Sequence, residues 1–250
     1  MNEETLDEIL DGRLRVFQKK NGYRFSLDAI LLADFISLSK NSQAIDIGTG
    51  SGIIPLILAL SYPHSRWVGL EIQEALRVLA QKSVTVNNLD ERIKIVQGDA
   101  RIYKKLFTAH SFDVVTFNPP YRKINSGRVN SQQEKAVARH EIKGSLKDFL
   151  PAAKYLLRPA GKVFTIYPAK RLIEMVSLFR GNGIEPKRMK LVFSSAESNA
   201  EFVLVEALAD GREELKIEPP LYIYDKSRNY TPQMHGIFSE LALSGTSGDD

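Results

Sequence analysis

Glycines alternate with small hydroxyl residues after an acidic residue in the run Asp46-Ile47-Gly48-Thr49-Gly50-Ser51-Gly52. Glycine lets the chain turn sharply and lets a ligand approach the backbone, because no Cβ is in the way. The spacing is G-x-G-x-G, whereas a dinucleotide turn reads G-x-G-x-x-G, and residue 53 is Ile. A phosphate P-loop is excluded too, because no Gly-Lys-Ser/Thr follows. The run predicts a tight strand-to-helix turn that cradles a different ligand.

Two more acidic residues follow strand-like runs of the chain. Glu71, with Ile72 beside it, comes 25 residues after Asp46, and Asp99 with Ala100 follows the run 92–97. Carboxylates at the carboxyl ends of successive parallel strands converge on one crevice, where open α/β sheets bind ligands. We expect Glu71 to accept both ribose hydroxyls of a nucleoside and Asp99 to accept an adenine amino group. So many carboxylates favour a cationic, phosphate-free ligand.

A second motif, Asn118-Pro119-Pro120-Tyr121, directly follows the strand-like run 111–117. An exocyclic amine on a planar ring is hard to methylate, because its lone pair is delocalised into the ring. The Asn118 oxygen and a Pro-Pro carbonyl can each accept one N–H, which aims the lone pair and stabilises the developing positive charge. The prolines hold these acceptors rigid, and Tyr121 offers a face on which a target base stacks. The motif predicts methylation of adenine N6, guanine N2 or a glutamine amide.

From residue 42 onward, strand-like runs alternate with helical patterns, which implies a doubly wound α/β sheet with parallel pairing. Only the short segment 194–200 separates the last two strands, too little for a parallel crossover, so we expect an antiparallel hairpin there. A seven-stranded, mostly parallel sheet with an antiparallel last strand is the Rossmann-like class I methyltransferase architecture. With the glycine turn and the acids, it predicts S-adenosyl-L-methionine as cofactor, bordered also by Asn118. The expected strands are 42–47, 66–72, 92–97, 111–117, 161–167, 187–193 and 201–208, and the expected helices are 53–61, 73–88, 146–157 and 171–180.

Composition and length fit one globular domain. The chain has 250 residues, of which 43% are apolar and 26% charged, enough for a single hydrophobic core. We expect one domain over 1–240, in which 1–41 form an N-terminal lid and helix extension, and a disordered tail over 241–250. No apolar run approaches the ~18 to 20 residues that span a bilayer, and the acidic N-terminus does not resemble a secretory signal, which favours a cytoplasmic protein. Without cysteine, and with four scattered histidines, thiolate chemistry is excluded and no metal is expected.

The net charge of +4 is small, but the charges are unevenly distributed. Residues 1–12 hold five acids and no bases, and residues 13–24 hold five bases and no acids. A second basic stretch follows the Asn118 motif. Local basic stretches on a weakly charged protein favour an anionic partner. We expect RNA contacts from Lys19, Lys20, Arg24, Arg122, Lys123, Arg128 and Arg139.

The segment 22–33 (GYRFSLDAILLA), joined to the glycine turn and the Asn118 motif, resembles the bacterial tRNA1(Val) (adenine-37-N6)-methyltransferase family. The runs 138–141 (ARHE), 220–224 (PLYIY) and 230–231 share this resemblance, which extends from about residue 14 to 237. It implies tRNA as substrate and methylation of the adenine beside the anticodon of a valine tRNA. It is consistent with 23–28, including Ser26, as a lid over the methionine end of the cofactor. Ser26 and Asp28 could equally cap the expected helix 29–38.

Three alternatives stay open. Release-factor glutamine N5-methyltransferases share the Asn118 motif, but they usually carry a helical substrate domain before the glycine turn, and only 45 residues precede Asp46. In guanine-N2 rRNA methyltransferases the motif more often ends in Phe than in Tyr. A cofactor-binding fold that acts only as an RNA chaperone would not need Asn118 and Tyr121 together. The sequence predicts no oligomeric state.

Overall fold

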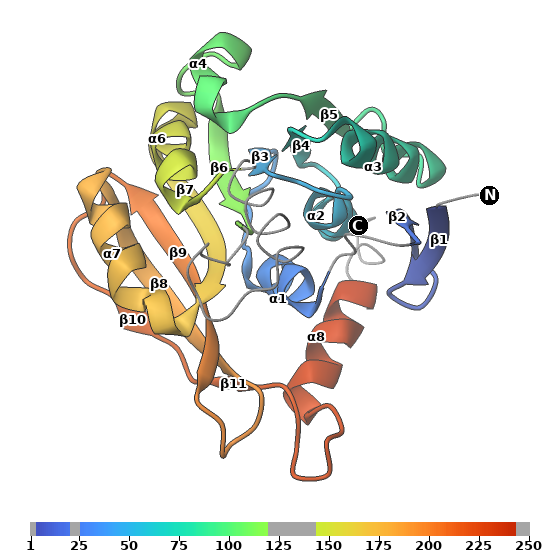
Figure 1. Cartoon of the computed structure of the whole chain (residues 1–250), viewed down its shortest axis with the longest axis vertical. Helices are drawn as coiled ribbons and strands as arrows, with labels where there is room; N and C mark the ends of the chain where they lie inside the picture. Colours follow the sequence, from blue (N-terminus) through green and yellow to red (C-terminus); the bar gives the residue numbers. More distant parts are fainter. Residues whose placement is uncertain (1–3, 21–25, 120–143, 244–250) are drawn as a thin grey trace, which may run out of the picture.

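A mixed β-sheet with helices on both faces forms the centre of the computed structural model, which describes residues 4–20, 26–119 and 144–243 (Figure 1). Helices α1, α2, α3 and α8 cover one face, and α4, α6 and α7 cover the other. Two single-turn 3₁₀ segments, η1 (Ala100–Ile102) and η2 (Ala169–Arg171), follow strands at the carboxyl edge. The helices are α1 (Leu27–Phe35), α2 (Ile53–Ser61), α3 (Glu74–Val86), α4 (Tyr103–Leu106), α6 (Leu146–Leu156), α7 (Leu172–Gly181) and α8 (Pro232–Leu243).

The sheet has the strand order β10-β8-β9-β7-β6-β3-β4-β5, and β11 extends the β8 edge. The adjacent strands β7, β6, β3, β4 and β5 are all parallel to one another, whereas β9 is antiparallel to both β7 and β8. The expected class I methyltransferase fold is confirmed, and the two-residue strands β10 and β11 add to it. The strands are β3 (Gln43–Ile47), β4 (Arg66–Glu71), β5 (Ile93–Gln97), β6 (Phe112–Phe117), β7 (Leu157–Pro168), β8 (Ile184–Phe193), β9 (Ala200–Ala209), β10 (Lys216–Ile217) and β11 (Leu221–Tyr222).

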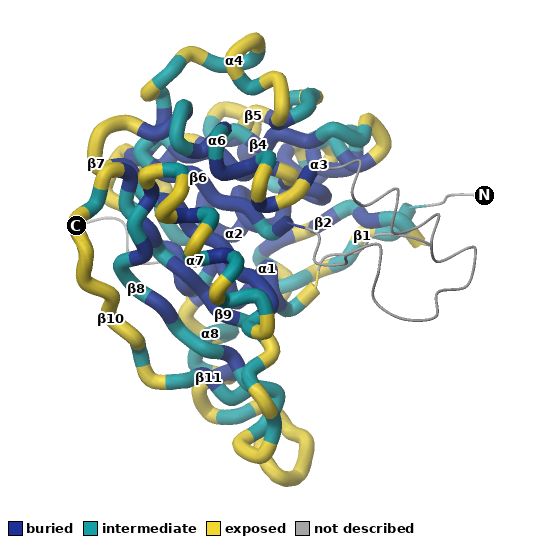
Figure 2. The backbone as a smooth tube through the Cα atoms, turned by 60° about the vertical axis from the view of Figure 1, so that its left-hand side comes forward, coloured by how far each residue is buried: buried dark blue, intermediate teal, exposed yellow. Residues whose placement is uncertain are grey.

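Alternation of side chains along the strands divides the core between the two faces of the sheet. In β3, Ala44 packs toward α1 and α2, and the next residue, Ile45, packs toward α6. Phe164 and Val163 of β7 alternate in the same way. Figure 2 shows buried backbone concentrated in the central strands and in α1 and α2. The central strands are mostly apolar, as strands covered on both faces require, and the buried polar residues Asp46, Glu71 and Thr116 stand near the carboxyl ends of β3, β4 and β6.

The N-terminal segment forms a hairpin that the sequence did not reveal, β1 (Glu4–Ile9) paired antiparallel with β2 (Leu14–Lys19). The pairing sets the acidic run against the basic run: Glu8 lies opposite Arg15, and Glu4 lies opposite Lys19. Opposite charges on facing strands attract each other. The acids of β1 therefore lie beside the bases of β2, and the basic run is not a patch of one sign.

Several element ends differ from the expected ones. Helix α1 begins two residues earlier and ends three residues earlier than the expected 29–38. Ser26 is its N-cap by position, but the Ser26 side chain makes no capping hydrogen bond. Helix α8 reaches Leu243, three residues into the expected tail, and was not predicted because Gly236 lies within it. In the described ranges, no helix is long and apolar enough to cross a membrane, and no three acidic or histidine side chains group around a possible metal position.

Candidate functional site

The glycine turn joins β3 to α2 and has left-handed backbone at each glycine. The φ angles are +76° at Gly48, +59° at Gly50 and +80° at Gly52. Residues with a Cβ rarely adopt such angles. At Gly52 a Cβ would also lie only 3.3 Å from the Cβ of Ala80, so glycine permits close packing of the turn on α3. The predicted tight turn is thus confirmed in its conformation, with Gly48 exposed and Gly50 and Gly52 buried.

Glu71 ends β4, and its carboxylate fastens the glycine turn. Oε2 accepts a hydrogen bond from the Gly50 amide at 2.9 Å, and Oε1 accepts one from the Gln73 amide at 2.8 Å. The residue is only 3% exposed, and Ile72 beside it is half-buried. Each carboxylate oxygen has a second lone pair, so the expected role toward ribose hydroxyls is compatible with these bonds. The sequence did not reveal that Glu71 also shapes the turn.

Buried polar atoms without hydrogen-bond partners gather around this turn. They are Oδ1 of Asp46 and the hydroxyl oxygens of Thr49, Ser51 and Thr116. Asp46 and Thr116 lie opposite each other in β3 and β6. Buried polar atoms in folded proteins nearly always have partners. Four such atoms at the expected cofactor position fit a polar ligand that supplies the missing hydrogen bonds.

Asp46 is buried beside a second carboxylate. Its exposed fraction is 1%. Burial raises the pKa of Asp46 to about 7, the adjacent Thr49 hydroxyl opposes this rise, and the negative charge of Glu71 adds to it. A cation near Asp46 would favour its ionised form. The electrostatics of the turn therefore fit a positively charged ligand, as expected from the number of acids.

Asp99 follows β5 and is paired with Arg101. The Arg101 Nε lies 2.9 Å from both carboxylate oxygens, and the Arg101 amide donates to Oδ1 at 2.9 Å, so Asp99 also caps η1. The hydrogen bond from Arg101 holds the pKa of Asp99 below its usual range. Asp99 is half-buried and Ala100 is buried. The carboxylate stays ionised at neutral pH, and its role toward adenine remains a prediction.

Asn118 lies at the carboxyl end of β6, near the first turn of α1. Its Nδ2 donates a hydrogen bond to Oδ2 of Asp28 at 3.1 Å. The preceding carbonyl, that of Phe117, accepts from the Thr165 hydroxyl at 2.8 Å, which ties this strand end to β7. Pro119 is buried. Pro120 and Tyr121 lie outside the described residues. Asp28 was missed as a partner of Asn118, although it stands in the segment that carried the family resemblance.

Phe149 of α6 lines both motifs from the other face of the sheet. Its ring centroid lies 5.7 Å from that of Phe117. A Cβ at Gly48 would lie 3.7 Å from the same ring. The glycine turn and the end of β6 therefore both lie against the Phe149 ring. Phe149 has no sequence signal beyond its place on the apolar face of a helix.

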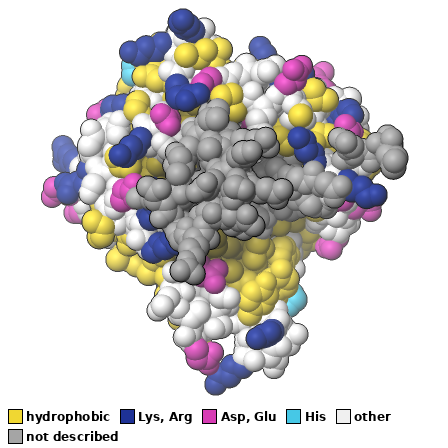
Figure 3. All heavy atoms as spheres, in the orientation of Figure 1, with side chains coloured by type: hydrophobic (Ala, Val, Ile, Leu, Met, Phe, Trp, Pro, Cys, Tyr) yellow, Lys and Arg dark blue, Asp and Glu magenta, His cyan; other side chains and the backbone are white. Residues whose placement is uncertain are grey.

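Of the expected RNA contacts, the structure describes Lys19, which is half-buried, and Lys20, which is exposed. Figure 3 shows Lys and Arg side chains interspersed with acidic ones on the visible face of the described residues. The other expected contacts lie outside the described residues: Arg24, Arg122, Lys123, Arg128 and Arg139.

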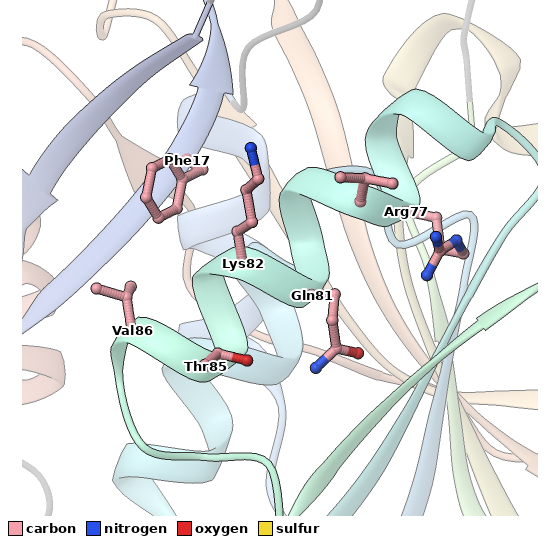
Figure 4. Close-up of a pocket in the computed structure, with 7 residues that line it drawn as sticks. Phe17, Arg77, Gln81, Lys82, Thr85 and Val86 are labelled. Atoms are coloured by element: carbon pink, nitrogen blue, oxygen red, sulfur yellow. The ribbon is translucent and has the colours of Figure 1, made fainter.

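A groove of about 590 Å³ runs between the N-terminal hairpin and α3 (Figure 4). Phe17 of β2 and Lys82 of α3 face each other across it, with the Lys82 ammonium 5.7 Å from the ring centroid. Lys82 also pairs with Glu4 at 2.6 Å. The groove is separate from the glycine turn, because no residue of that turn lines it. Its lining residues are Phe17, Arg77, Val78, Gln81, Lys82, Thr85 and Val86.

Residues 24–176, which include the glycine turn and the Asn118 motif, match the family described as methyltransferase small domain. The chain belongs to this family. It is an S-adenosyl-L-methionine-dependent methyltransferase. The expected cofactor and enzyme class are thereby confirmed.

Relatives with assigned names extend the match over nearly the whole chain. A tRNA1(Val) (adenine(37)-N6)-methyltransferase of Histophilus somni is 28% identical over 239 residues, which cover 95% of this chain and 98% of the relative. One of the same name from Pasteurella multocida is 26% identical and covers 87% and 89%. The resemblance seen in the sequence motifs is therefore confirmed.

Solved structures show the same fold at low identity. A protein of Agrobacterium tumefaciens described as a predicted O-methyltransferase is 18% identical, with a TM-score of 0.69 over 86% of this chain and 96% of that one. The 16S rRNA N2 G1207 methyltransferase of T. thermophilus, solved with AdoMet and guanosine, is 17% identical. Its TM-score is 0.55, over 82% of this chain and 50% of that one. These two likenesses support the class I fold of the methyltransferase.

Proposed function

We propose that this methyltransferase methylates N6 of an adenine in tRNA, with adenine 37 of a valine tRNA as the expected nucleotide. The observation that carries the proposal is the position of Asn118, at the carboxyl end of β6 with its amide nitrogen bonded to Asp28. Support for the substrate comes from relatives that are named for this reaction and match 95% of the chain. A tRNA substrate also agrees with the cytoplasmic location expected from the sequence.

The residues of the glycine turn and its neighbours would hold the cofactor. Asp46, Thr49 and Ser51 offer buried polar atoms that need partners, Glu71 would accept the ribose hydroxyls, and Asp99 would accept the adenine amino group. Ser26, Ile72, Ala100 and Asn118 border the same crevice in this proposal. When bound, S-adenosyl-L-methionine supplies an electrophilic methyl group and positive charge.

Asn118 would bind the target amine. Its Oδ1 accepts one N–H of the exocyclic amine, and a carbonyl of the segment Pro119-Pro120 accepts the other. Two acceptors draw the nitrogen away from conjugation with the ring and stabilise the positive charge that develops on it. No general base is needed before transfer, because the product nitrogen releases its proton to solvent afterwards. Tyr121 would stack on the flipped base.

The basic residues would contact the tRNA backbone. Lys19 and Lys20 are at the end of β2, and the hairpin lies along α3: the Arg15 amide bonds Asn87, and the Phe17 amide bonds Ser83. Each step along β2 therefore moves toward the start of α3, which follows Glu71. This direction brings Lys19 toward the cofactor edge of the sheet, where an RNA would bind. Arg24, Arg122, Lys123, Arg128 and Arg139 would complete the contacts.

Transfer of tritiated methyl groups to total RNA and to release-factor protein, followed by nucleoside and amino-acid analysis, tests the proposal. We expect N6-methyladenosine in the tRNA fraction only. N2-methylguanosine in rRNA, or methylglutamine in protein, would refute it in favour of an alternative reaction. Asn118→Ala should reduce transfer severely, to a rate that single-turnover assays still measure, and keep cofactor binding. The matched variant Asn199→Ala, at an exposed position between β8 and β9, should transfer at the normal rate.

A further inference from the structure

We propose that Asp28 is a positioning residue: it fixes which end of the Asn118 side-chain amide is presented to the target amine. The inference rests on the proposed function only in that Asn118 binds an amine. It applies equally whether that amine belongs to adenine, guanine or glutamine.

Hydrogen bonds from Asn118 and Ser26 orient the Asp28 carboxylate. Oδ2 accepts from Nδ2 of Asn118 at 3.1 Å, and Oδ1 accepts from the Ser26 hydroxyl. Asp28 is 8% exposed, so little water competes for these bonds. Hydrogen bonds to an ionised acceptor are stronger than those between neutral groups. The contact joins the first turn of α1 to the end of β6.

The chemistry of the two groups makes this contact directional. The nitrogen and oxygen ends of an asparagine amide have nearly the same shape, so only their hydrogen-bond partners decide which end points where. An ionised carboxylate only accepts hydrogen bonds, so it attracts Nδ2 and repels Oδ1. Because Nδ2 points at Asp28, Oδ1 points away from Asp28. This is the orientation in which Oδ1 accepts an N–H of the target amine.

Helix α1 is a rigid support for this carboxylate. Seven of its nine residues are buried. At its far end, Nη2 of Arg188 donates to the Phe35 carbonyl at 2.8 Å, and the guanidinium lies 3.9 Å from the Phe35 ring centroid. Arg188 in turn bonds Glu206 of β9 at 2.8 Å. One end of α1 is thus anchored to the sheet while the other presents Asp28, and precise support of this kind is what a positioning group needs.

A purely structural role for Asp28 makes a different prediction. An acid in the first turn of a helix interacts favourably with the helix dipole, so Asp28→Ala could lower stability without any effect through Asn118. Asp34, half-buried near the end of the same helix, provides the matched control. Asp34→Ala perturbs α1 without removing the Asn118 contact.

A double-mutant cycle separates the two roles kinetically. For whichever acceptor the enzyme methylates, Asp28→Ala should lower kcat about 10- to 100-fold and leave the Kd for S-adenosyl-L-methionine within about twofold. In the Asn118→Ala background, the same change should cost nothing further, because residues that act as a unit are not additive. Additive losses would refute the proposal, as would an equal loss of kcat in Asp34→Ala. Asp28→Asn should recover part of the rate, because an amide oxygen still accepts from Nδ2.

A spectroscopic measurement tests the same contact without any turnover. In ¹⁵N-labelled protein, the Asn118 side-chain NH₂ signals are assigned by their loss in Asn118→Ala. We expect a rigid NH₂ group in the wild type and in Asp34→Ala, and a mobile one in Asp28→Ala. A side-chain amide equally rigid in Asp28→Ala would overturn the inference even if tRNA adenine is methylated. A mobile one would support it even if the methylated group is guanine or glutamine.

Discussion

The amide nitrogen of Gly50 lies 2.9 Å from Oε2 of Glu71, so the turn after β3 is fastened to the carboxylate that ends β4. The two strands are neighbours in the sheet, with Asp46 opposite Gly69. A Cβ at Gly69 would lie 2.9 Å from the Thr49 side chain, so glycine at this position makes room for the turn. Glu71 therefore contributes to the site in two ways, through its own acceptors and through the conformation of the glycine backbone.

Glu71→Gln should weaken cofactor binding by at least about tenfold. Glutamine has one side-chain acceptor oxygen in place of two, so it cannot hold the Gly50 and Gln73 amides as the carboxylate does, and one N–H loses its partner. Isothermal titration with S-adenosyl-L-methionine measures the loss. Glu74→Gln, an exposed acid in the first turn of α3, is the control and should bind normally. Equal affinities of Glu71→Gln and wild type would contradict the proposed role.

Cofactor binding should strengthen as pH rises through 7. The pKa of Asp46 is about 7, and a cationic ligand prefers the ionised form, so binding near neutral pH releases a proton. From pH 6 to 8 we expect about a tenfold gain in affinity in the wild type. Titrations in buffers of different ionisation enthalpy measure the proton release. Asp46→Asn should show neither the release nor the gain, whereas Asp34→Asn should behave as the wild type.

The same ionisation should affect stability without cofactor. Because burial raises the pKa of Asp46 above its unfolded value, the native state binds the extra proton between about pH 4 and 7. Stability from this group is complete below that window and is lost as pH rises through it. Asp46→Asn should therefore melt a few degrees higher than wild type at pH 8 and at nearly the same temperature at pH 4. A lower melting temperature for Asp46→Asn at pH 8 would contradict this sign.

Asp99 should select adenine over hypoxanthine in the cofactor. A carboxylate accepts from an adenine amino group but repels the carbonyl oxygen of hypoxanthine. Asp99→Asn should lose about 10-fold in affinity for S-adenosylhomocysteine and gain affinity for S-inosylhomocysteine. Arg101→Gln keeps the carboxylate and removes its ion pair, so it should still prefer the adenine compound. An unchanged preference in Asp99→Asn would exclude Asp99 from adenine recognition.

The features predicted from sequence share one property: each is carried by contiguous residues. The glycine turn, Glu71 and Asn118 all follow strands whose apolar pattern marks them as buried. The contact of Asp28 with Asn118 joins residues 90 apart in the sequence. Nothing in the local pattern of either residue specifies the other. Phe149 has no polar signal at all, and its place against Gly48 and Phe117 follows from the packing of α6 on the sheet.

The N-terminal hairpin was missed for a different reason. Its first strand, ETLDEI, is too rich in acids to read as a strand by hydrophobic alternation. Its contacts with the rest of the protein come from the ion pair of Glu4 with Lys82 and from the bonds of β2 to α3. The separation of acids and bases in the sequence suggested that the basic residues bind a partner outside the chain. In the structure, the acidic strand β1 lies beside the basic strand β2. The charges of Lys19 and Lys20 therefore need a direct test.

Removing the two positive charges of Lys19 and Lys20 should weaken tRNA binding and reduce its salt dependence. Each phosphate contact contributes roughly 0.7 to 0.9 to the slope of log K against log salt concentration, so Lys19→Gln/Lys20→Gln should lower the slope by about 1.5. Lys40→Gln/Arg66→Gln removes the same charge from exposed positions at the amino ends of β3 and β4. That edge lies opposite the glycine turn, so this control should keep the wild-type slope. Filter binding over a salt series measures both. If both double variants lose slope equally, the effect reflects net charge alone, and Lys19 and Lys20 do not contact the RNA.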